Sequence, residues 1–158
     1  MEQTALFAAG CFWGVEFEFS NLKGVTGTLA GYSGGDDKKF PSPSYEMVCT
    51  GKTGHAETVQ VKFDPKKLSY QDLVEFFFDL HDPTTVNRQG PDIGTQYRSA
   101  IFYTDTEQKK TAEKIRDKIQ KKLGITLATQ IAPAGKFWIA EEYHQKYAEK
   151  HGGAACHI

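Results

Sequence analysis

The sequence predicts an α+β fold, a two-layer α/β sandwich in which a mixed sheet carries its helices mainly on one face, around a ferredoxin-like core. Two observations lead to this prediction. Segments with the apolar period of strands alternate along the chain with segments that have the period of helices. One link, between the second and third strands, contains no long helix, which is typical of strand-helix-strand units that form a two-layer α+β sandwich. We expect residues 1–158 to form one domain, with residues 152–158 as a flexible tail that carries a thiol.

The first half of the chain combines short apolar runs with one amphipathic helix. The expected elements are a strand at 4–9, a helix from 11 to a glycine cap at 24, a strand at 25–32, a helical turn at 45–50 and a strand at 57–63. Phe12, Val15, Phe19 and Leu22 have spacings of three and four, so they share one helix face. Residues 57–63 alternate between apolar and polar, which is the period of a half-buried strand.

The second half continues the alternation. The expected elements are a helix at 69–81, a loop at 87–95, a strand at 97–103, a helix at 106–123, a strand at 125–131 and a polar helix at 141–150. Ser69 and Asp72 have the spacing of a capping box, which marks the start of the first of these helices. Gly124 is a typical helix end.

Charge and composition exclude several classes of protein. Nineteen basic and twenty acidic residues leave a formal net charge of -1, so no overall positive field is available to collect nucleic acid. No apolar run approaches the roughly 20 residues that span a bilayer, and the N-terminus lacks the pattern of a signal peptide. We therefore expect a cytoplasmic protein. Its three cysteines are too few for a disulfide scaffold, which leaves thiol chemistry, metal binding or packing.

Cys11 is the first candidate for chemistry. It follows Gly10 and opens a predicted helix directly after a predicted strand. Backbone N–H groups and the positive end of the helix dipole stabilise a thiolate at this place, so thiols here have lowered pKa values and are reactive. The adjacent Phe12 and Trp13 could wall an apolar pocket. The alternative is that Cys11 is a small buried packing residue.

Glu57 is the second candidate. The alternation places its carboxyl on the same face as Val59, Val61 and Phe63, which should be the core face. Burial raises the pKa of a carboxyl group and keeps it neutral, and a neutral acid is suited to donate a proton. The alternative is an exposed or salt-bridged Glu57 at the end of the strand.

The other two cysteines differ in their surroundings. Cys156 follows two glycines near the C-terminus, so its thiol could approach Cys11 and form a transient disulfide, or it could have no role. Cys49 lies in a helical turn, and packing is its expected role. No metal is expected, because Cys49, His55, Cys156 and His157 lack the spacing of a zinc site.

Two other classes of function remain open from the residues alone. A cysteine hydrolase or acyltransferase would pair Cys11 with a histidine base, either His55 or His144, and would leave the tail thiol without a purpose. A non-catalytic α+β binding module would give Cys11 the slow alkylation of an ordinary thiol. The rate of alkylation of Cys11 against pH separates this module from both enzymes.

Five segments of the sequence resemble, in order, the motifs of the peptide-methionine (S)-S-oxide reductase family, MsrA. They are GCFWG at 10–14, GHAE at 54–57, HDPTT at 81–85, DIGTQYRS at 92–99 and EYHQ at 142–145. The resemblance covers nearly the whole chain. It implies reduction of methionine S-sulfoxide, free or in proteins, to methionine.

The resemblance also implies the roles of individual residues. Cys11 would attack the sulfoxide sulfur and become a sulfenic acid, Glu57 would protonate the sulfoxide oxygen, and Cys156 would resolve the sulfenic acid as a disulfide. Thioredoxin, or dithiothreitol in its place, would reduce that disulfide without a cofactor or metal. The expected partners are thioredoxin and oxidised proteins or peptides, with no nucleic acid and no membrane, and the chain is expected to be a monomer.

The same resemblance implies a substrate site. Phe12 and Trp13 would hold the S-methyl group of the substrate. Tyr45 and Tyr97 would donate further hydrogen bonds to the sulfoxide oxygen. Asp92 would help to shape the site.

Overall fold

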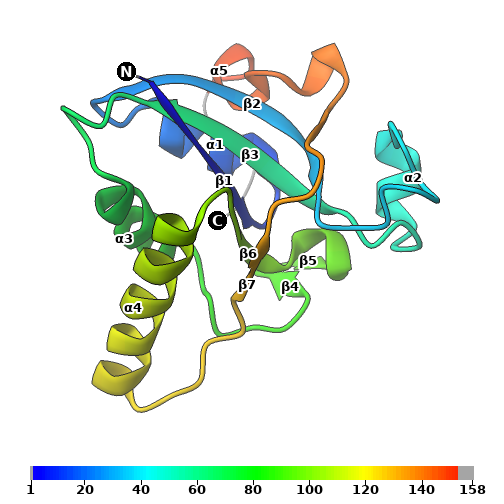
Figure 1. Cartoon of the computed structure of the whole chain (residues 1–158). Coiled ribbons are helices and arrows are strands. Elements are labelled where there is room, and N and C mark those ends of the chain that lie inside the picture. The colour runs from blue at the N-terminus through cyan, green and yellow to red at the C-terminus, as the bar shows by residue number, and fades with distance from the viewer. Residues whose placement is uncertain (1, 153–158) are drawn as a thin grey trace.

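The fold is built on a six-stranded sheet, shown by the computed structural model, which describes residues 2–152 (Figure 1). The strand order is β7-β6-β1-β3-β2-β8. These strands are β1 (Gln3–Ala9), β2 (Val25–Ser33), β3 (Ala56–Phe63), β6 (Ser99–Tyr103), β7 (Gln130–Pro133) and β8 (Trp138–Ile139). Strands β6 and β7 are parallel, and the other neighbours are antiparallel. The predicted mixed sheet is confirmed.

The helices connect the strands in the predicted pattern. They are α1 (Phe12–Ser20), α2 (Tyr45–Cys49), α3 (Tyr70–Leu80), α4 (Thr106–Leu123) and α5 (Tyr147–Lys150), with 3-10 turns η1 (Thr95–Tyr97) and η2 (Glu142–His144). The segments β1-α1-β2 and β3-α3-β6 give the central order β6-β1-β3-β2, which is the ferredoxin-like arrangement. The end of β1 and the starts of β3, β6 and α1 therefore converge.

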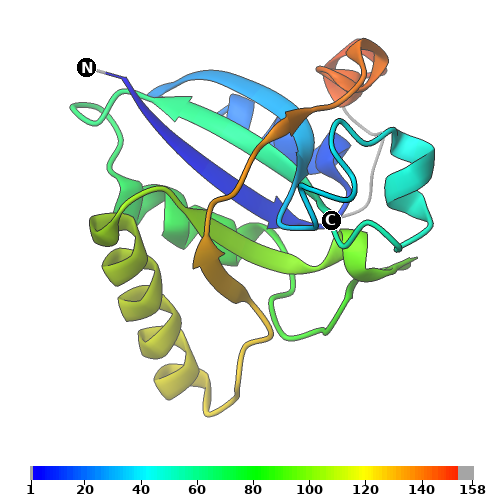
Figure 2. The same ribbon diagram turned by 45° about the vertical axis from the view of Figure 1, so that its right-hand side comes forward.

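The two faces of the sheet are covered differently. Helices α1, α3 and α4 contribute to the larger apolar core, in which Phe7 of β1 stacks on Phe19 and Phe77 at centroid distances of 5.0 and 5.3 Å. On the other face, the chain between β7 and β8 crosses the sheet (Figure 2). Its Phe137 packs with Leu6 and Phe102 in a smaller cluster. The prediction of helices mainly on one face is confirmed.

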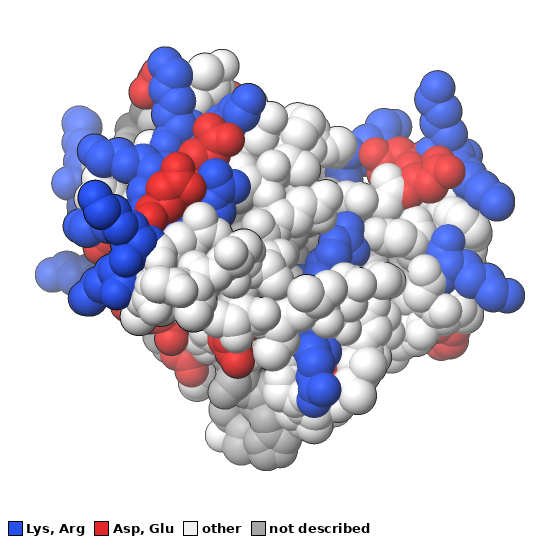
Figure 3. All heavy atoms as spheres, turned by 90° about the horizontal axis from the view of Figure 1, so that it is seen from below, with Lys and Arg blue, Asp and Glu red and all other residues white. Residues whose placement is uncertain are grey.

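The surface mixes charges of both signs. On the face in Figure 3, acidic and basic side chains lie side by side at two edges, and the area between them is mostly uncharged apart from isolated basic side chains. This matches the near-zero net charge of the chain. Within residues 2–152, no helix combines the length and apolarity needed to cross a bilayer.

Three segments differ from the sequence prediction. Part of the expected loop at 87–95 is a hairpin of β4 (Arg88–Gln89) and β5 (Asp92–Ile93). The expected strand at 125–131 is displaced to β7, beside β6. The expected helix at 141–150 is broken into η2 and α5, because Lys146 adopts a positive φ of 55°. In this conformation the backbone N–H of Lys146 donates to the buried carboxylate of Glu16. The two residues are distant in the sequence, so no local pattern predicts this contact.

A buried histidine joins α3 to the sheet. The Nδ1–H of His81 donates to the carbonyl of Phe77 at 2.7 Å, so in the neutral ring Nε2 accepts from the hydroxyl of Ser99, also at 2.7 Å. The hydroxyl of Thr129 extends this series of hydrogen bonds, with its oxygen 2.8 Å from the hydroxyl oxygen of Ser99. Burial lowers the pKa of His81 to about 4, although Phe77 and Asp82 oppose the shift.

We predict that His81 makes the fold sensitive to acid. The unfolded chain takes up a proton below the ordinary imidazole pKa of about 6.5, whereas the folded chain does so only near 4. The free energy of unfolding should therefore fall by about 3 kcal/mol from this residue between pH 7 and pH 4. Urea unfolding of wild type and His81→Gln over this range measures it. Parallel pH profiles of the two proteins would contradict the prediction.

Candidate active site

Cys11 lies at the sharp junction between β1 and α1. Gly10 before it has a φ of +103°, and a Cβ at Gly10 would come within 2.9 Å of Gln89. Glycine is thus required both by the turn and by the close approach of β4. Cys11 is the N-cap of α1 and its side chain is half-buried. The thiol therefore lies at the positive end of the helix dipole, where a thiolate is stabilised.

Glu57 lies at the same helix end. Its side chain is 1% exposed, and its Oε1 accepts a hydrogen bond of 3.1 Å from the backbone N–H of Phe12. The predicted burial of Glu57 is confirmed, and the alternative of an exposed residue at the strand end is wrong. Strands β1 and β3 are antiparallel neighbours, so the end of one meets the start of the other. This pairing brings a carboxyl group beside the residue that carries the thiol.

Two tyrosines approach the same place from different elements. Tyr45 begins α2, which is capped by the Ser44 hydroxyl, and Tyr97 ends η1. Burial, followed by the negative charge of Glu57, raises the pKa of both phenols well above the ordinary value. The charges of Cys11 and Asp92 raise the pKa of Tyr97 further. Both tyrosines therefore remain protonated at neutral pH and can donate hydrogen bonds.

Asp92 reaches the site on the β4-β5 hairpin. This hairpin is held by Gln89, whose side-chain amide donates to the carbonyl of Asp82 at 2.7 Å and accepts from its N–H at 2.9 Å. Asp92 is half-buried and lies close enough to Tyr97 to raise its pKa. No periodic pattern indicates this hairpin, because its two strands are only two residues long.

Phe12 and Trp13 form part of an aromatic cluster. Phe12 is buried, while Trp13 is half-buried and stacks on Tyr147 with ring centroids 3.8 Å apart. The ring of His144 lies between Phe12 and Tyr45. Its centroid is 5.1 Å from that of Phe12 and 4.5 Å from that of Tyr45. The cluster supplies apolar surface next to Cys11.

Glu141 connects Tyr32 of β2 to the start of α2 at Tyr45. Its two carboxylate oxygens accept from the hydroxyl of Tyr32 at 2.8 Å and from the backbone N–H of Tyr45 at 2.9 Å. Burial acts to raise the pKa of Glu141, but these hydrogen bonds and the nearby His144 outweigh it and hold the pKa below the ordinary value. The sequence assigned no role to Glu141, and it indicated His144 only as a member of the EYHQ motif and as a possible base of a hydrolase. Neither shows a local signal of its contacts, since the partners are distant in the sequence.

The histidines do not support a hydrolase. His55 accepts from the N–H of Gly35 at Nδ1 and lies 3.2 Å from the carbonyl of Phe40 at Nε2, so both nitrogens are engaged in a loop. His144 accepts the indole N–H of Trp13. Neither ring contacts Cys11 through these bonds. Within residues 2–152, no group of three or more His, Cys, Asp or Glu residues could hold a metal ion.

Comparisons with known proteins show the family of this chain. The family described as peptide methionine sulfoxide reductase matches residues 3–158. The peptide methionine sulfoxide reductase MsrA of Acidobacterium capsulatum is 53% identical over 156 residues, which cover 98% of each chain. This chain belongs to the peptide methionine sulfoxide reductase family. It catalyses the thiol-dependent reduction of methionine S-sulfoxide to methionine.

Solved structures of the same family have the same fold. Mxr1 from Saccharomyces cerevisiae in reduced form is 41% identical with a TM-score of 0.91, covering 98% of this chain and 88% of that one. Mxr1 from the same yeast in complex with Trx2 is 29% identical with a TM-score of 0.65, covering 98% of this chain and 86% of that one. The α+β fold predicted from the sequence is confirmed by this agreement.

The remaining cysteines of this reductase have different positions. Cys49 ends α2 and is exposed, so the packing role expected from the sequence is wrong. Although the residue as a whole is exposed, its thiol is partly shielded from water. This shielding and the charge of Glu57 raise the pKa of the thiol, against a hydrogen bond with Tyr45 that lowers it. Cys49 is therefore a weak nucleophile at neutral pH. Cys156 lies outside the described residues.

Proposed function

We propose that Cys11 is the nucleophile and Glu57 the acid of the reduction. The observation that supports this most is the hydrogen bond from the N–H of Phe12 to Glu57, which holds a buried carboxyl group at the helix start that carries Cys11. A sulfoxide oxygen is a poor leaving group unless it is protonated. A thiolate is a suitable nucleophile for sulfur, so the reaction needs these two groups together.

The proposed chemistry transfers one oxygen atom. The Cys11 thiolate bonds to the sulfoxide sulfur while Glu57 donates a proton to the oxygen. The protonated oxygen then moves from this sulfur to the Cys11 sulfur as the new sulfur–sulfur bond and the original sulfur–oxygen bond break, so that the sulfoxide is reduced to the thioether of methionine and Cys11 is oxidised to a sulfenic acid. The thiol of Cys156 attacks this sulfenic acid, water leaves, and a Cys11–Cys156 disulfide remains.

The surrounding residues fit substrate binding. The half-buried Trp13 offers apolar surface to the S-methyl group, and the buried Phe12 belongs to the same aromatic cluster. The protonated phenols of Tyr45 and Tyr97 donate to the sulfoxide oxygen. Asp92 shapes the site through the hairpin that carries it. The raised phenol pKa values support these donor roles over the whole neutral range.

We also propose that thioredoxin recycles the enzyme without a cofactor or metal. The related yeast protein Mxr1 has been solved in complex with Trx2, which supports a protein partner of this kind. Cys156 lies six positions after Lys150, the last residue of α5, whose Tyr147 stacks on Trp13. A fully extended chain of six residues spans about 20 Å, which is the reach on which this proposal depends. Residues 1–158 would form one catalytic domain with 152–158 as its flexible tail, acting as a monomer in the cytoplasm on oxidised proteins or peptides.

Substitution of the proposed nucleophile tests this function directly. Cys11→Ser should abolish the reduction of a methionine S-sulfoxide peptide with either reductant, because a hydroxyl is a far weaker nucleophile than a thiolate. Cys49→Ser is the matched control and should turn over like wild type. Chromatography of the peptide product measures both. Turnover of Cys11→Ser near the wild-type rate would remove Cys11 from the mechanism.

Loss of the acid should slow the first step. Glu57→Gln keeps a hydrogen-bonding side chain but has no proton to transfer, and general acid catalysis typically contributes about 100- to 10,000-fold. We expect the single-turnover rate of methionine formation to fall within that range, measured by rapid quench. Circular dichroism should show an unchanged fold. An unaltered rate would leave Glu57 with a structural role alone.

The two reductants separate the proposed roles of Cys11 and Cys156. Cys156→Ser should still form about one methionine per enzyme, since the first step needs only Cys11 and Glu57. It should then stall with thioredoxin, which reduces a disulfide, and recover much of its turnover with dithiothreitol, which is small enough to reach a sulfenic acid. Burst amplitude and steady-state rate measure these steps. If Cys49→Ser stalls instead, the resolving role belongs to Cys49.

A further inference from the structure

The orientation of Trp13 is fixed by the segment that precedes the C-terminus. One face of its indole lies on the ring of Tyr147, at 3.8 Å between centroids and 11° between planes. Its N–H donates to Nδ1 of His144 at 2.9 Å. A stacked face and a directed hydrogen bond together leave the indole one orientation. Both partners come from a segment to which the proposed function assigns no role.

The hydrogen bond to Trp13 requires a neutral His144. An indole N–H can only donate, so Nδ1 of His144 must accept, and the ring proton must be on Nε2. A protonated imidazole carries hydrogen on both nitrogens and accepts nothing. The side chain of His144 is fully buried, and its Nε2 has no hydrogen-bond partner among the described residues. Protonation would therefore leave two N–H groups facing each other inside the cluster.

The groups around His144 act in opposite directions. Burial lowers the pKa of its imidazole, while the charges of Glu141 before η2 and Glu46 on α2 raise it. The phenols of Tyr143 and Tyr45 also face the ring, at centroid distances of 4.0 and 4.5 Å. The net shift is downward, which keeps the ring neutral at neutral pH and places its titration on the acid side of the ordinary imidazole pKa of about 6.5.

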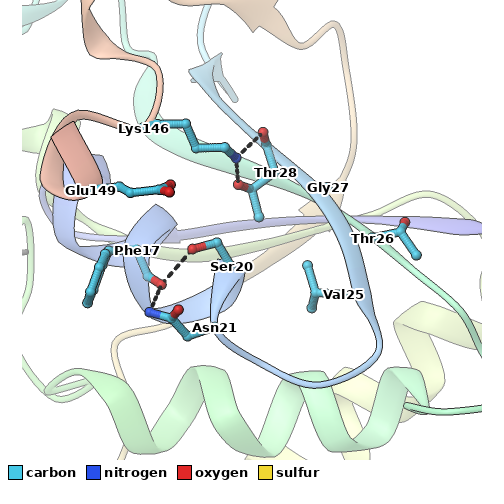
Figure 4. A pocket seen from close by; sticks show the side chains of 9 residues that line it. All are labelled: Phe17, Ser20, Asn21, Val25, Thr26, Gly27, Thr28, Lys146 and Glu149. Carbon is cyan, nitrogen blue, oxygen red and sulfur yellow. Dashed lines mark hydrogen bonds between the residues drawn. The ribbon is translucent and has the colours of Figure 1, made fainter.

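The backbone on the C-terminal side of His144 cannot move away easily. The side chain of Gln145 bonds to both the N–H and the carbonyl of Ala30 in β2. The ammonium group of Lys146 contacts Thr28 and the buried carboxylate of Glu16 on α1, at the edge of a hollow shown in Figure 4. These anchors hold His144 against the helix that carries Trp13.

We infer that His144 is a positioning residue for the reduction: its neutral imidazole fixes the indole of Trp13 against the methyl group of the sulfoxide, and its protonation releases that indole. This inference rests on the proposed function, which assigns Trp13 to the substrate site. It adds a pH-sensitive control of substrate binding that acts through Trp13. The inference concerns binding of the substrate and leaves the chemistry of Cys11 unchanged.

The chain provides an internal control for a spectroscopic test. It has two tryptophans, and the indole N–H of the second, Trp138, donates to Asp37 at 2.9 Å. In a pH titration by NMR, the indole N–H resonance of Trp13 should shift with a midpoint below about 6.5 in wild type and show no such transition in His144→Asn. The Trp138 resonance should not follow this transition. A Trp13 resonance that does not titrate, or that titrates equally in His144→Asn, would overturn the inference.

Kinetics provide the second test. The amide of His144→Asn can still accept from Trp13 and cannot titrate, whereas His144→Phe fills the space without an acceptor. In single-turnover reduction of a methionine sulfoxide peptide, His144→Phe should raise the half-saturating peptide concentration about tenfold, with a smaller effect on the maximal rate. His144→Asn should resemble wild type at neutral pH and lack its weaker binding at acid pH. Equal weakening by both variants would mean that His144 has only a structural role.

A double-mutant cycle separates this inference from the proposed function. In a Trp13→Phe background, which lacks the indole N–H, His144→Phe should cause no further weakening of substrate binding. An additive effect would show that His144 acts without Trp13 and would overturn the inference. The proposed function fails on a different result, the retention of turnover in Cys11→Ser. The wild-type titration of Trp13 needs no variant, so it decides the inference even if a His144 variant does not fold.

Discussion

The contact between the N–H of Phe12 and the carboxyl group of Glu57 is the point on which the site depends. It exists because β1 and β3 are antiparallel neighbours, so the end of the first lies beside the start of the second. The turn at Gly10 then starts α1 at this edge of the sheet. A thiol at a helix start and a buried carboxyl group are thereby brought together by sheet topology, and neither requires a specialised loop.

The parts of the site that the sequence predicts are those set by local periodicity. Alternation over residues 57–63 correctly placed Glu57 on the buried face, and the junction after Gly10 correctly placed Cys11 at a helix start. The helix over 106–123 also has its predicted bounds. In each case the pattern of apolar and polar residues over a few neighbouring positions indicates a helix or a strand. A short stretch of sequence is therefore enough to predict these elements.

The C-terminal segment could not be predicted in the same way. Its polar residues have the composition of a solvent-exposed helix, yet Lys146 leaves the helical region to bond with Glu16, and His144 is buried among aromatic rings. These contacts join residues about 130 positions apart. The free energy that breaks the helix comes from buried polar partners, and tertiary contacts of this kind commonly override local propensity. Cys49 was misjudged for a related reason, because a five-residue helix buries only Val48.

The buried polar groups of this segment also explain why Trp13 can be held in one orientation although it lies on a short helix. Helix α1 has nine residues, and its own sequence contains no acidic residue in the first turn and no basic residue in the last turn. Its orientation therefore depends on packing and on groups from outside, of which Glu57 engages its first N–H and Lys146 engages Glu16 in its second turn. An uncompensated carboxylate at Glu16 would be costly in this environment, so the segment that carries His144 must stay in place for α1 to keep its own buried charge paired. The same constraint that stabilises α1 thus holds His144 against Trp13.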